Sequence, residues 1–381
     1  MAATRDPAKT ERIPILVGRF VATIEAPSSV ATQVRSVFVD LLRSADGLPG
    51  SIISVRAEGT ASDRGTPYQV TVDGVRWVPE AHHEIIDQLV YVIMRATLDA
   101  EPELLHLHAG YVAVGGKGVL IAGFPGSGKS TLVTALIEAG FDYFTDERVG
   151  LDRAGRLFPL PKPISLVESS FAVLAHLDPA RTGVGVVTNR LWHVPASAVR
   201  EGSVTESASL HAVVFVQFDK NAPLMVTEVH PIEAARRLLS DSPDALRFGP
   251  DGVALVAGVC NDHHAVQVVF GETDAAIRAI RALADRAPRV REDQLSHLSG
   301  GISEDVVGVA VGAKCLVRRN SNGELIELDG AAAAWLQLLD GHSPLGDIIS
   351  EVAEANGVTP AQVAVVARAA VQELTDLGVV S

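Results

Sequence analysis

One short stretch, residues 119–132, limits what this chain can fold into more than any other part of the sequence. It reads VLIAGFPGSGKSTL, an apolar run followed by a glycine-rich loop and then by apolar residues at helical spacing. Gly123, Gly128, Lys129 and Ser130 fit the phosphate-loop pattern G-x-x-x-x-G-K-[ST]. The stretch therefore predicts a strand, a phosphate-binding loop and a helix, which is an α/β arrangement.

The chemistry of such a loop explains its spacing. Glycines let successive backbone N–H groups turn inward on phosphate oxygens, and the helix N-terminus adds partial positive charge. Lys129 would reach the β- and γ-phosphates, and Ser130 would offer its hydroxyl to Mg²⁺. We therefore expect ATP and Mg²⁺ as cofactors. The residues expected to hold the nucleotide are Gly123, Pro125, Gly126, Ser127, Gly128, Lys129, Ser130 and Thr131.

Two carboxylates follow the next short strand. Residues 141–145 are strand-like and end at Asp146 and Glu147. Ligands of parallel α/β sheets bind beyond the carboxyl ends of the strands. One carboxylate can accept the proton of an attacking hydroxyl while the other helps to hold Mg²⁺. Taken alone, an Asp-Glu pair at a strand end also fits a solvated turn, but its place soon after a phosphate loop favours the functional interpretation.

Charge and cysteine content narrow the classes of partner and compartment. The net charge is −14 with no basic block to offset it, which argues against a nucleic-acid partner. Cys260 and Cys315 lie far apart in apolar runs and are expected to be buried thiols in a reducing compartment. No apolar run approaches the ~20 residues that span a bilayer, and residues 1–12 lack the apolar core of a signal peptide. We expect a cytoplasmic protein without a membrane partner.

A chain of 381 residues is too long for one typical domain. The expected segments are an N-terminal α/β lobe (1–100), a phosphate-loop catalytic domain (101–285), a linker (286–300) and a C-terminal module (301–381). The linker is predicted because its residues mix charge with Pro and Gly and break all periodicity. Within the catalytic domain, Val253 to Ala257 and Ala265 to Phe270 are expected to be late strands.

The C-terminal module combines two or three predicted strands with three predicted short helices, a winged-helix-like order. Residues 301–381 carry four Lys/Arg against eleven Asp/Glu, a net of −7, which disfavours DNA binding. A better use of such a module is an open sheet edge that accepts an extended peptide as an added strand.

Residues 104–152 resemble the catalytic core of HPr kinase/phosphorylase, whose fold is related to that of phosphoenolpyruvate carboxykinase. The matching pieces are His108-Ala109, Gly123 to Ser130, Gly140 and Asp146-Glu147, with Glu147 where the family has a second Asp. The resemblance implies that Asp146 is the base that takes the seryl proton, that His108 tunes its charge, and that Ser130 and Glu147 hold Mg²⁺. Without the resemblance, His108 fits a core or hairpin histidine.

Residues 303–381 resemble the PqqD family of leader-peptide-recognition modules, which serve ribosomally made, post-translationally modified peptides. The resemblance rests on Leu325 to Leu328, Ala334-Trp335, Leu338 to Gly341, Ile348, Gly357-Val358 and Leu374 to Val379. It implies a groove between the third strand and the third helix of the module. The residues expected to line that groove are Leu325, Ile326, Glu327, Leu328, Val363, Ala367 and Val371.

Together the two resemblances imply a serine/threonine kinase that phosphorylates a precursor peptide captured by its leader. Lys129 and Arg190 would offset the charge that develops on the transferred group. Related kinases assemble as oligomers, so a homo-oligomer is a further implied arrangement. Two other classes stay open: an ATP-binding peptide chaperone that transfers nothing, and a small-molecule kinase for which the C-terminal module serves only in docking.

Overall fold

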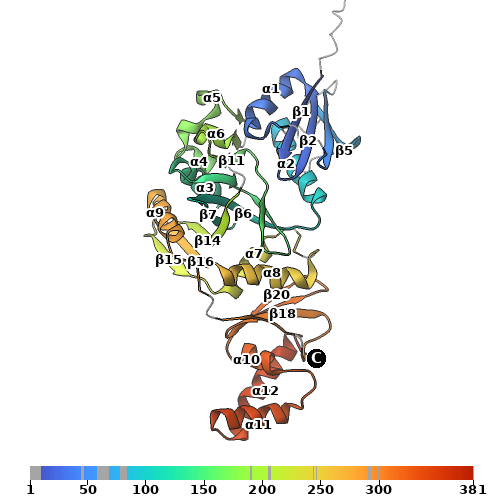
Figure 1. Cartoon of the computed structure of the whole chain (residues 1–381), viewed down its shortest axis with the longest axis vertical. Helices are drawn as coiled ribbons and strands as arrows, with labels where there is room; N and C mark the ends of the chain where they lie inside the picture. The colour runs from blue at the N-terminus through green and yellow to red at the C-terminus, as the bar shows by residue number, and fades with distance from the viewer. Residues whose placement is uncertain are drawn as a thin grey trace, which may run out of the picture.

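The computed structural model describes residues 10–43, 47–57, 68–77, 84–188, 191–204, 207–242, 244–245, 247–290, 293–298 and 300–380. The molecule is elongated (Figure 1). An N-terminal lobe lies beside a central sheet, and the C-terminal sheet and its helices extend from the opposite end. The mixed α/β architecture expected from the phosphate-loop stretch is confirmed. Within the described ranges, no helix has the length and apolar character needed to span a bilayer.

The N-terminal lobe is a five-stranded sheet covered by helices. Its elements are β1 (Thr10–Val17), β2 (Phe20–Pro27), α1 (Ser28–Val37), β3 (Gly50–Ala57), β4 (Tyr68–Val72), β5 (Val75–Trp77) and α2 (Ile85–Ala100). Burial alternates along β2, as a sheet with one face on a core requires. The apolar faces of α1 and α2 share that core with the sheet. The lobe therefore has a hydrophobic core of its own.

The central sheet carries the phosphate loop. Its strands are β6 (Leu105–Val114), β7 (Lys117–Ala122), β8 (Asp142–Thr145), β9 (Arg148–Leu151), β10 (Leu157–Pro159), β14 (Ser209–Phe218), β15 (Met225–Glu228) and β16 (His264–Phe270). The order is β10-β9-β6-β7-β14-β16-β15, with β8 also paired to β6. Strands β7 and β8 are both antiparallel to β6, so they run in the same direction. Their carboxyl ends therefore meet at one edge of the sheet, where β14 and β16 also end.

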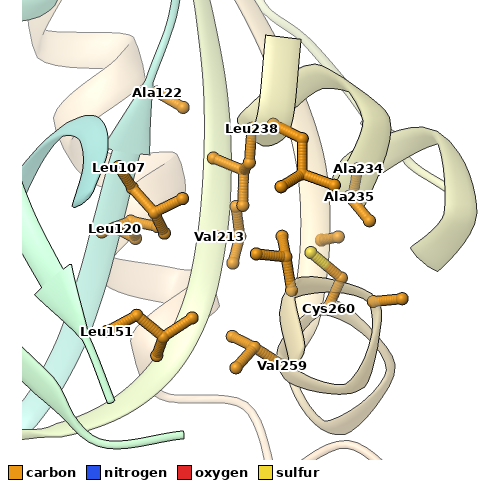
Figure 2. Close-up of a cluster of buried hydrophobic side chains, with 14 of the residues drawn as sticks. Leu107, Leu120, Ala122, Leu151, Val213, Ala234, Ala235, Leu238, Val259 and Cys260 are labelled. Atoms are coloured by element: carbon orange, nitrogen blue, oxygen red, sulfur yellow. The ribbon is translucent and has the colours of Figure 1, made fainter. Parts of the chain in front are cut away.

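Helices cover both faces of this sheet. Alternating residues of β7 enter two different cores: Val119 and Ile121 pack with α3 (Lys129–Glu138) and α9 (Thr273–Ala284), whereas Leu120 and Ala122 face the opposite side. That opposite core is built on α7 (Pro231–Ser240) and α8 (Gly249–Asp262). Figure 2 shows part of it, with sheet residues such as Leu107 and Val213 facing Leu238 and Cys260.

Residues 253–257 were expected to form a strand and are instead part of α8. Pro250 stands at the first turn of this helix, where its missing N–H costs nothing. Val253, Val256, Ala257 and Cys260 are buried at helical spacing against the central sheet. The short apolar run was therefore one side of a longer helix.

A small third sheet lies beside α3 and connects the central sheet to the N-terminal lobe. Its strands are β11 (Ile164–Val167), β12 (Val186–Val187) and β13 (Leu191–Val194), in the order β11-β13-β12. The short helices around it are α4 (Glu168–Phe171), α5 (Pro179–Thr182) and α6 (Ala196–Val199). Ser36 of α1 accepts a hydrogen bond from the backbone of Gly185, which ties this sheet to the lobe.

The C-terminal part is a four-stranded antiparallel sheet followed by three helices. Its elements are β17 (Leu295–Leu298), β18 (Val306–Val311), β19 (Lys314–Arg319), β20 (Leu325–Leu328), α10 (Gly330–Leu338), α11 (Leu345–Asn356) and α12 (Pro360–Asp376). The predicted linker, residues 286–300, contains β17, so the linker prediction is wrong for that part. The reason is that Leu295–Leu298 pairs with β18 along its whole length. The winged-helix likeness remains a prediction.

The C-terminal sheet is buried on both faces. Val309, Val311 and Leu316 belong to the same hydrophobic cluster as α7 and α8. The alternate residues Ala310, Cys315 and Val317 pack instead with α10 and α12. Figure 1 shows α8 lying across this sheet. The sheet therefore joins α7 and α8 of the central part to the C-terminal helices through continuous packing.

Candidate functional site

The phosphate loop connects the buried end of β7 to the start of α3. Gly128 has φ 87°, a left-handed conformation that favours glycine. A Cβ at Gly123 would lie 2.5 Å from Ser127 Oγ and 2.9 Å from the carbonyl oxygen of Val216. Glycine is therefore required at both ends of the loop. Gly128 is required by its positive φ, and Gly123 is required because a side chain there would collide with Ser127 and Val216.

Lys129 projects from the first turn of α3 and is only 9% exposed. Its Nζ has no hydrogen-bond partner among the described residues. Burial lowers the pKa of this ammonium to about 8, against the opposing effect of the Asp146 and Asp241 carboxylates. A buried, unpaired cation at a helix N-terminus is costly unless an anion is present. The loop therefore fits the phosphates of a nucleotide on chemical grounds.

Two cavities flank the loop. The larger, of ≈ 400 Å³, runs along the start of α3 toward α4 and is lined by Gly126, Gly128, Lys129, Ser130, Thr131, Ser165, Val167, Ser170 and Phe270, among others. The second, of ≈ 290 Å³, lies between the loop and α7 and is lined by Gly123, Phe124, Pro125, Gly126, Ser127, Phe215, Gln217, Arg237 and Asp241, among others. His108 lines both. All eight residues expected to hold the nucleotide thus face one or both cavities.

The two carboxylates lie in the turn that links β8 and β9. Asp146 is 2% exposed, and its Oδ1 accepts a hydrogen bond from Tyr143 at 3.1 Å. Lys162 Nζ lies 3.0 Å from the same oxygen and 3.3 Å from Oε2 of Glu147. The turn is held from within because Thr145 Oγ1 accepts the backbone N–H of Glu147. Asp146 is therefore buried and held in place by its contacts, and it is not part of a solvated turn.

Lys162 was not singled out by the sequence. It lies in a Pro-rich stretch, and its side chain is buried. Burial alone would lower the pKa of its ammonium, but Asp146 and Glu147 outweigh it and raise that pKa. In turn, burial alone would raise the pKa of the Glu147 carboxyl, but Lys162 and Arg148 outweigh it and lower that pKa. Lys162 thus favours the ionised form of the Glu147 carboxyl inside the protein.

His108 contacts a different carboxylate from the one that the resemblance implied. Its Nδ1 lies 2.9 Å from Oδ2 of Asp241, the residue that ends α7. Burial and the nearby Lys129 charge lower the pKa of the imidazole, with Asp241 opposing them. Nδ1 of the His108 imidazole therefore faces the Asp241 carboxylate. Neither Asp241 nor this contact was predicted from the sequence. Asp241 lies 133 residues after His108, and an Asp at the end of a helix has no local pattern that marks it as part of a site.

The two residues expected to hold Mg²⁺ approach the site from separate elements. Ser130 lines the larger loop cavity, whereas Glu147 lines a different cavity beside α2. Within the described ranges, no group of three or more His, Cys, Asp or Glu side chains is placed to hold a metal ion by itself. Mg²⁺ in kinase sites uses one or two carboxylates together with substrate phosphates and water. Ser130 and Glu147 therefore fit a Mg²⁺ site only if phosphate and water oxygens complete the coordination.

Arg190, the other cation expected to act in transfer, lies outside the described residues. The groove residues expected in the C-terminal module fall into two clusters. Leu328 packs with Leu374 of α12, whereas Val363 and Ala367 are buried against Trp335 and its neighbours. Leu325, Ile326, Glu327 and Val371 are half-buried. Their role in binding a peptide stays a prediction.

Comparison with known families identifies the C-terminal part. The family model of PqqD, described as coenzyme PQQ synthesis protein D, matches residues 315–380. The chain is thus a mixed α/β protein that carries a PqqD domain at its C-terminus. The PqqD match covers β19, β20 and all three following helices.

Two other comparisons were made. A search of curated proteins found no match. Among solved structures, the chain is similar to the HPr(Ser) kinase/phosphatase from Coxiella burnetii, with 15% identity over 47% of this chain and 92% of that chain. The TM-score of that pair is 0.25. This likeness is too distant to carry any argument about activity.

Proposed function

We propose that the protein is an ATP-dependent serine/threonine kinase that phosphorylates a ribosomally made precursor peptide, which its PqqD domain captures by the leader. The observation that carries the proposal is the pairing of two features at one edge of the central sheet. The phosphate loop presents the buried, unpaired Nζ of Lys129, and the next parallel strand along the chain ends in the fixed carboxylate of Asp146.

The residues of this chain divide the chemistry between them. Backbone N–H groups of the loop and the ammonium of Lys129 would bind and orient the phosphates of ATP. The contacts from Lys162 and Tyr143 both go to Oδ1 of Asp146, so Oδ2 is the oxygen that would take the proton of the acceptor hydroxyl. Ser130 and Glu147 would hold Mg²⁺, which neutralises charge on the phosphates when it is bound.

The PqqD domain supplies the peptide partner in this proposal. A leader peptide would add as a strand along β20 and lie against α12, as the resemblance implies. Capture on the same rigid body would raise the local concentration of the acceptor segment at the kinase site. The packing of the C-terminal sheet on α7 and α8 supports this, because it holds β20 at a fixed place relative to the phosphate loop.

The test is the intact mass of the precursor peptide encoded beside this gene, after incubation with the protein and MgATP. A gain of one phosphate group is expected. Asp146→Asn should lose at least about 100-fold in rate, the usual contribution of a general base, while still binding ATP. The matched control is Asp251→Asn, an exposed carboxylate that pairs with Arg153 on α8's outer side.

Each other outcome has a definite meaning. A mass gain of a nucleotide would move the chemistry to the α-phosphate and overturn phosphoryl transfer. An unchanged mass with the leader still bound would favour an ATP-binding chaperone or a small-molecule kinase. Equal rates for Asp146→Asn and the unsubstituted protein would remove Asp146 from its role as base.

A further inference from the structure

A third cavity, of ≈ 210 Å³, lies between the N-terminal lobe and the site. One wall is α2, which contributes Tyr91, Met94 and Leu98. The opposite wall comes from the catalytic part and includes Glu147, Arg148 and Ser165. We call this cavity the α2 cleft. No role assigned so far uses it, although it contains one of the two carboxylates of the site.

The α2 cleft adjoins the phosphate-loop cavity at two points. Ser165 lines both cavities. Lys162 donates to Ser165 Oγ at 3.1 Å and also contacts Glu147 at 3.3 Å. One buried ammonium thus contacts both the residue shared by the two cavities and the carboxylate of the α2 cleft. A chain segment in the α2 cleft would therefore pass directly beside Glu147, the residue that follows Asp146.

The far end of the cleft is rigid. Asp87 of α2 and His193 of β13 are both buried and hydrogen-bonded to one another. His193 also lies 3.4 Å from Ser165 Oγ through its other ring nitrogen. This buried chain of contacts fixes α2 relative to the catalytic part. The cleft is thus a preformed site, which reduces the entropic cost of binding.

The residues that line the α2 cleft indicate which kind of side chain it can bind. Tyr91, Met94 and Leu98 supply apolar surface on the α2 wall, which also contains Asp87 and Arg95. Arg148 and Glu147 line the opposite wall as charged groups. A cavity of ~150 Å³ lined by apolar residues holds a benzene molecule, so this volume suits one large apolar or aromatic side chain. The charged wall suits the polar backbone and hydroxyl of a neighbouring residue.

We propose that the α2 cleft is the acceptor site: it receives the segment of the peptide that carries the acceptor hydroxyl, with a large apolar side chain adjacent to that residue seated against α2. This inference rests on the proposed kinase function and adds the substrate class to it. Selectivity for an apolar neighbour then comes from the N-terminal lobe, and the PqqD domain reads only the leader.

The first test substitutes two apolar residues that line the α2 cleft. Leu98→Glu, and separately Tyr91→Glu, should raise the KM for the peptide at least about tenfold, because a carboxylate would replace apolar contact. The dissociation constant for ATP and the melting temperature should stay unchanged. Val75→Glu is the matched control, since Val75 is an apolar residue of the same lobe, 73% exposed and not part of the cleft. An unchanged KM in both cleft variants would overturn the proposal.

The second test uses a peptide library with a fixed central serine and randomised neighbours, incubated with full-length protein and MgATP. Phosphorylated members should be enriched in Leu, Ile, Phe or Tyr at one neighbouring position, and Leu98→Glu should abolish that enrichment. Phosphorylation without any apolar preference would overturn the acceptor-site proposal and leave the kinase proposal standing. No phosphorylation of any member, nor of the precursor peptide, would overturn both.

Discussion

Lys162 Nζ lies 3.0 Å from Oδ1 of Asp146, and both side chains are almost fully buried. Without a cation at this distance, two neighbouring carboxyl groups in a protein interior would tend to take up a proton. Lys162 removes that tendency for Glu147, whose pKa lies below its usual value for this reason and because of Arg148. The structure thus favours an ionised Glu147 in the free protein, as the proposed role in holding Mg²⁺ requires.

Lys162→Met should destabilise the fold strongly, by about 3–5 kcal/mol, because it leaves two carboxylates without their buried partner. Urea unfolding followed by tryptophan fluorescence measures this. The double variant Lys162→Met/Asp146→Asn should lose less than the sum of the two single changes. Lys314→Met is the control, since Lys314 forms a more exposed pair with Glu327 and should cost only about 0–1 kcal/mol. Equal losses at the two lysines would contradict this account.

The buried ammonium of Lys129 should make stability depend on pH in a definite direction. Its pKa is about 8 in the folded protein and 10.5 ordinarily, so between these values the unfolded chain binds more protons. Stability therefore rises with pH across that window, and the cost of burying the charge is present below it. Relative to Lys129→Met, the wild-type free energy of unfolding should increase by about 2 kcal/mol from pH 8 to pH 10 in nucleotide-free buffer.

Paired urea titrations of the two proteins at each pH give this difference directly. Lys220→Met, at an exposed lysine, controls for the loss of a lysine as such. A difference that stays flat or falls with rising pH would show that Lys129 is solvated in the free protein. The same Lys129→Met variant should lose ATP binding, which isothermal titration calorimetry measures.

Asp241 should act on catalysis through the charge of Lys129. Its carboxylate raises the pKa of Lys129, so Asp241→Asn should lower that pKa further. The alkaline limb of kcat/KM for ATP, which reports the free enzyme, should then move to lower pH, with roughly a threefold loss at about pH 8.5. Asp285→Asn is a matched control because Asp285 ends α9 in the same way. A profile that drops uniformly at all pH values would point to a purely structural role.

The sequence predicted the centre of the site better than its surroundings. The loop and the two carboxylates were found because a phosphate loop has a fixed local spacing and because strand ends in an α/β sheet meet at one edge. Lys162 and Asp241 were missed because they reach the site through tertiary packing, from a Pro-rich stretch and from a helix end. Neither position has a local pattern that distinguishes it from an ordinary surface charge.

Element assignment failed where short apolar runs were ambiguous. Residues 253–257 fit a buried strand as well as one turn of a buried helix, and only packing against the central sheet decides between them. Leu295–Leu298 was assigned to the linker because four residues between charged and Gly-rich stretches show no periodicity. Its pairing with β18 supplies the order that the local sequence does not. The PqqD domain, in contrast, was predicted from the order and spacing of short motifs such as Ala334-Trp335 and Leu338 to Gly341.

Removing residues 301–381 would be a poor test of leader capture, since Val309, Val311 and Leu316 would be lost from the core that covers α8. We expect the shortened chain to bind the dye ANS and to melt at a lower temperature, whatever the role of the leader. A substitution on α12 separates the two effects. Val371→Arg should raise the KM for the precursor at least about tenfold with kcat and melting temperature unchanged, because it places a charge beside β20. Val365→Arg, at a position 72% exposed on α12, should change neither constant, and equal effects at the two positions would count against a groove between β20 and α12.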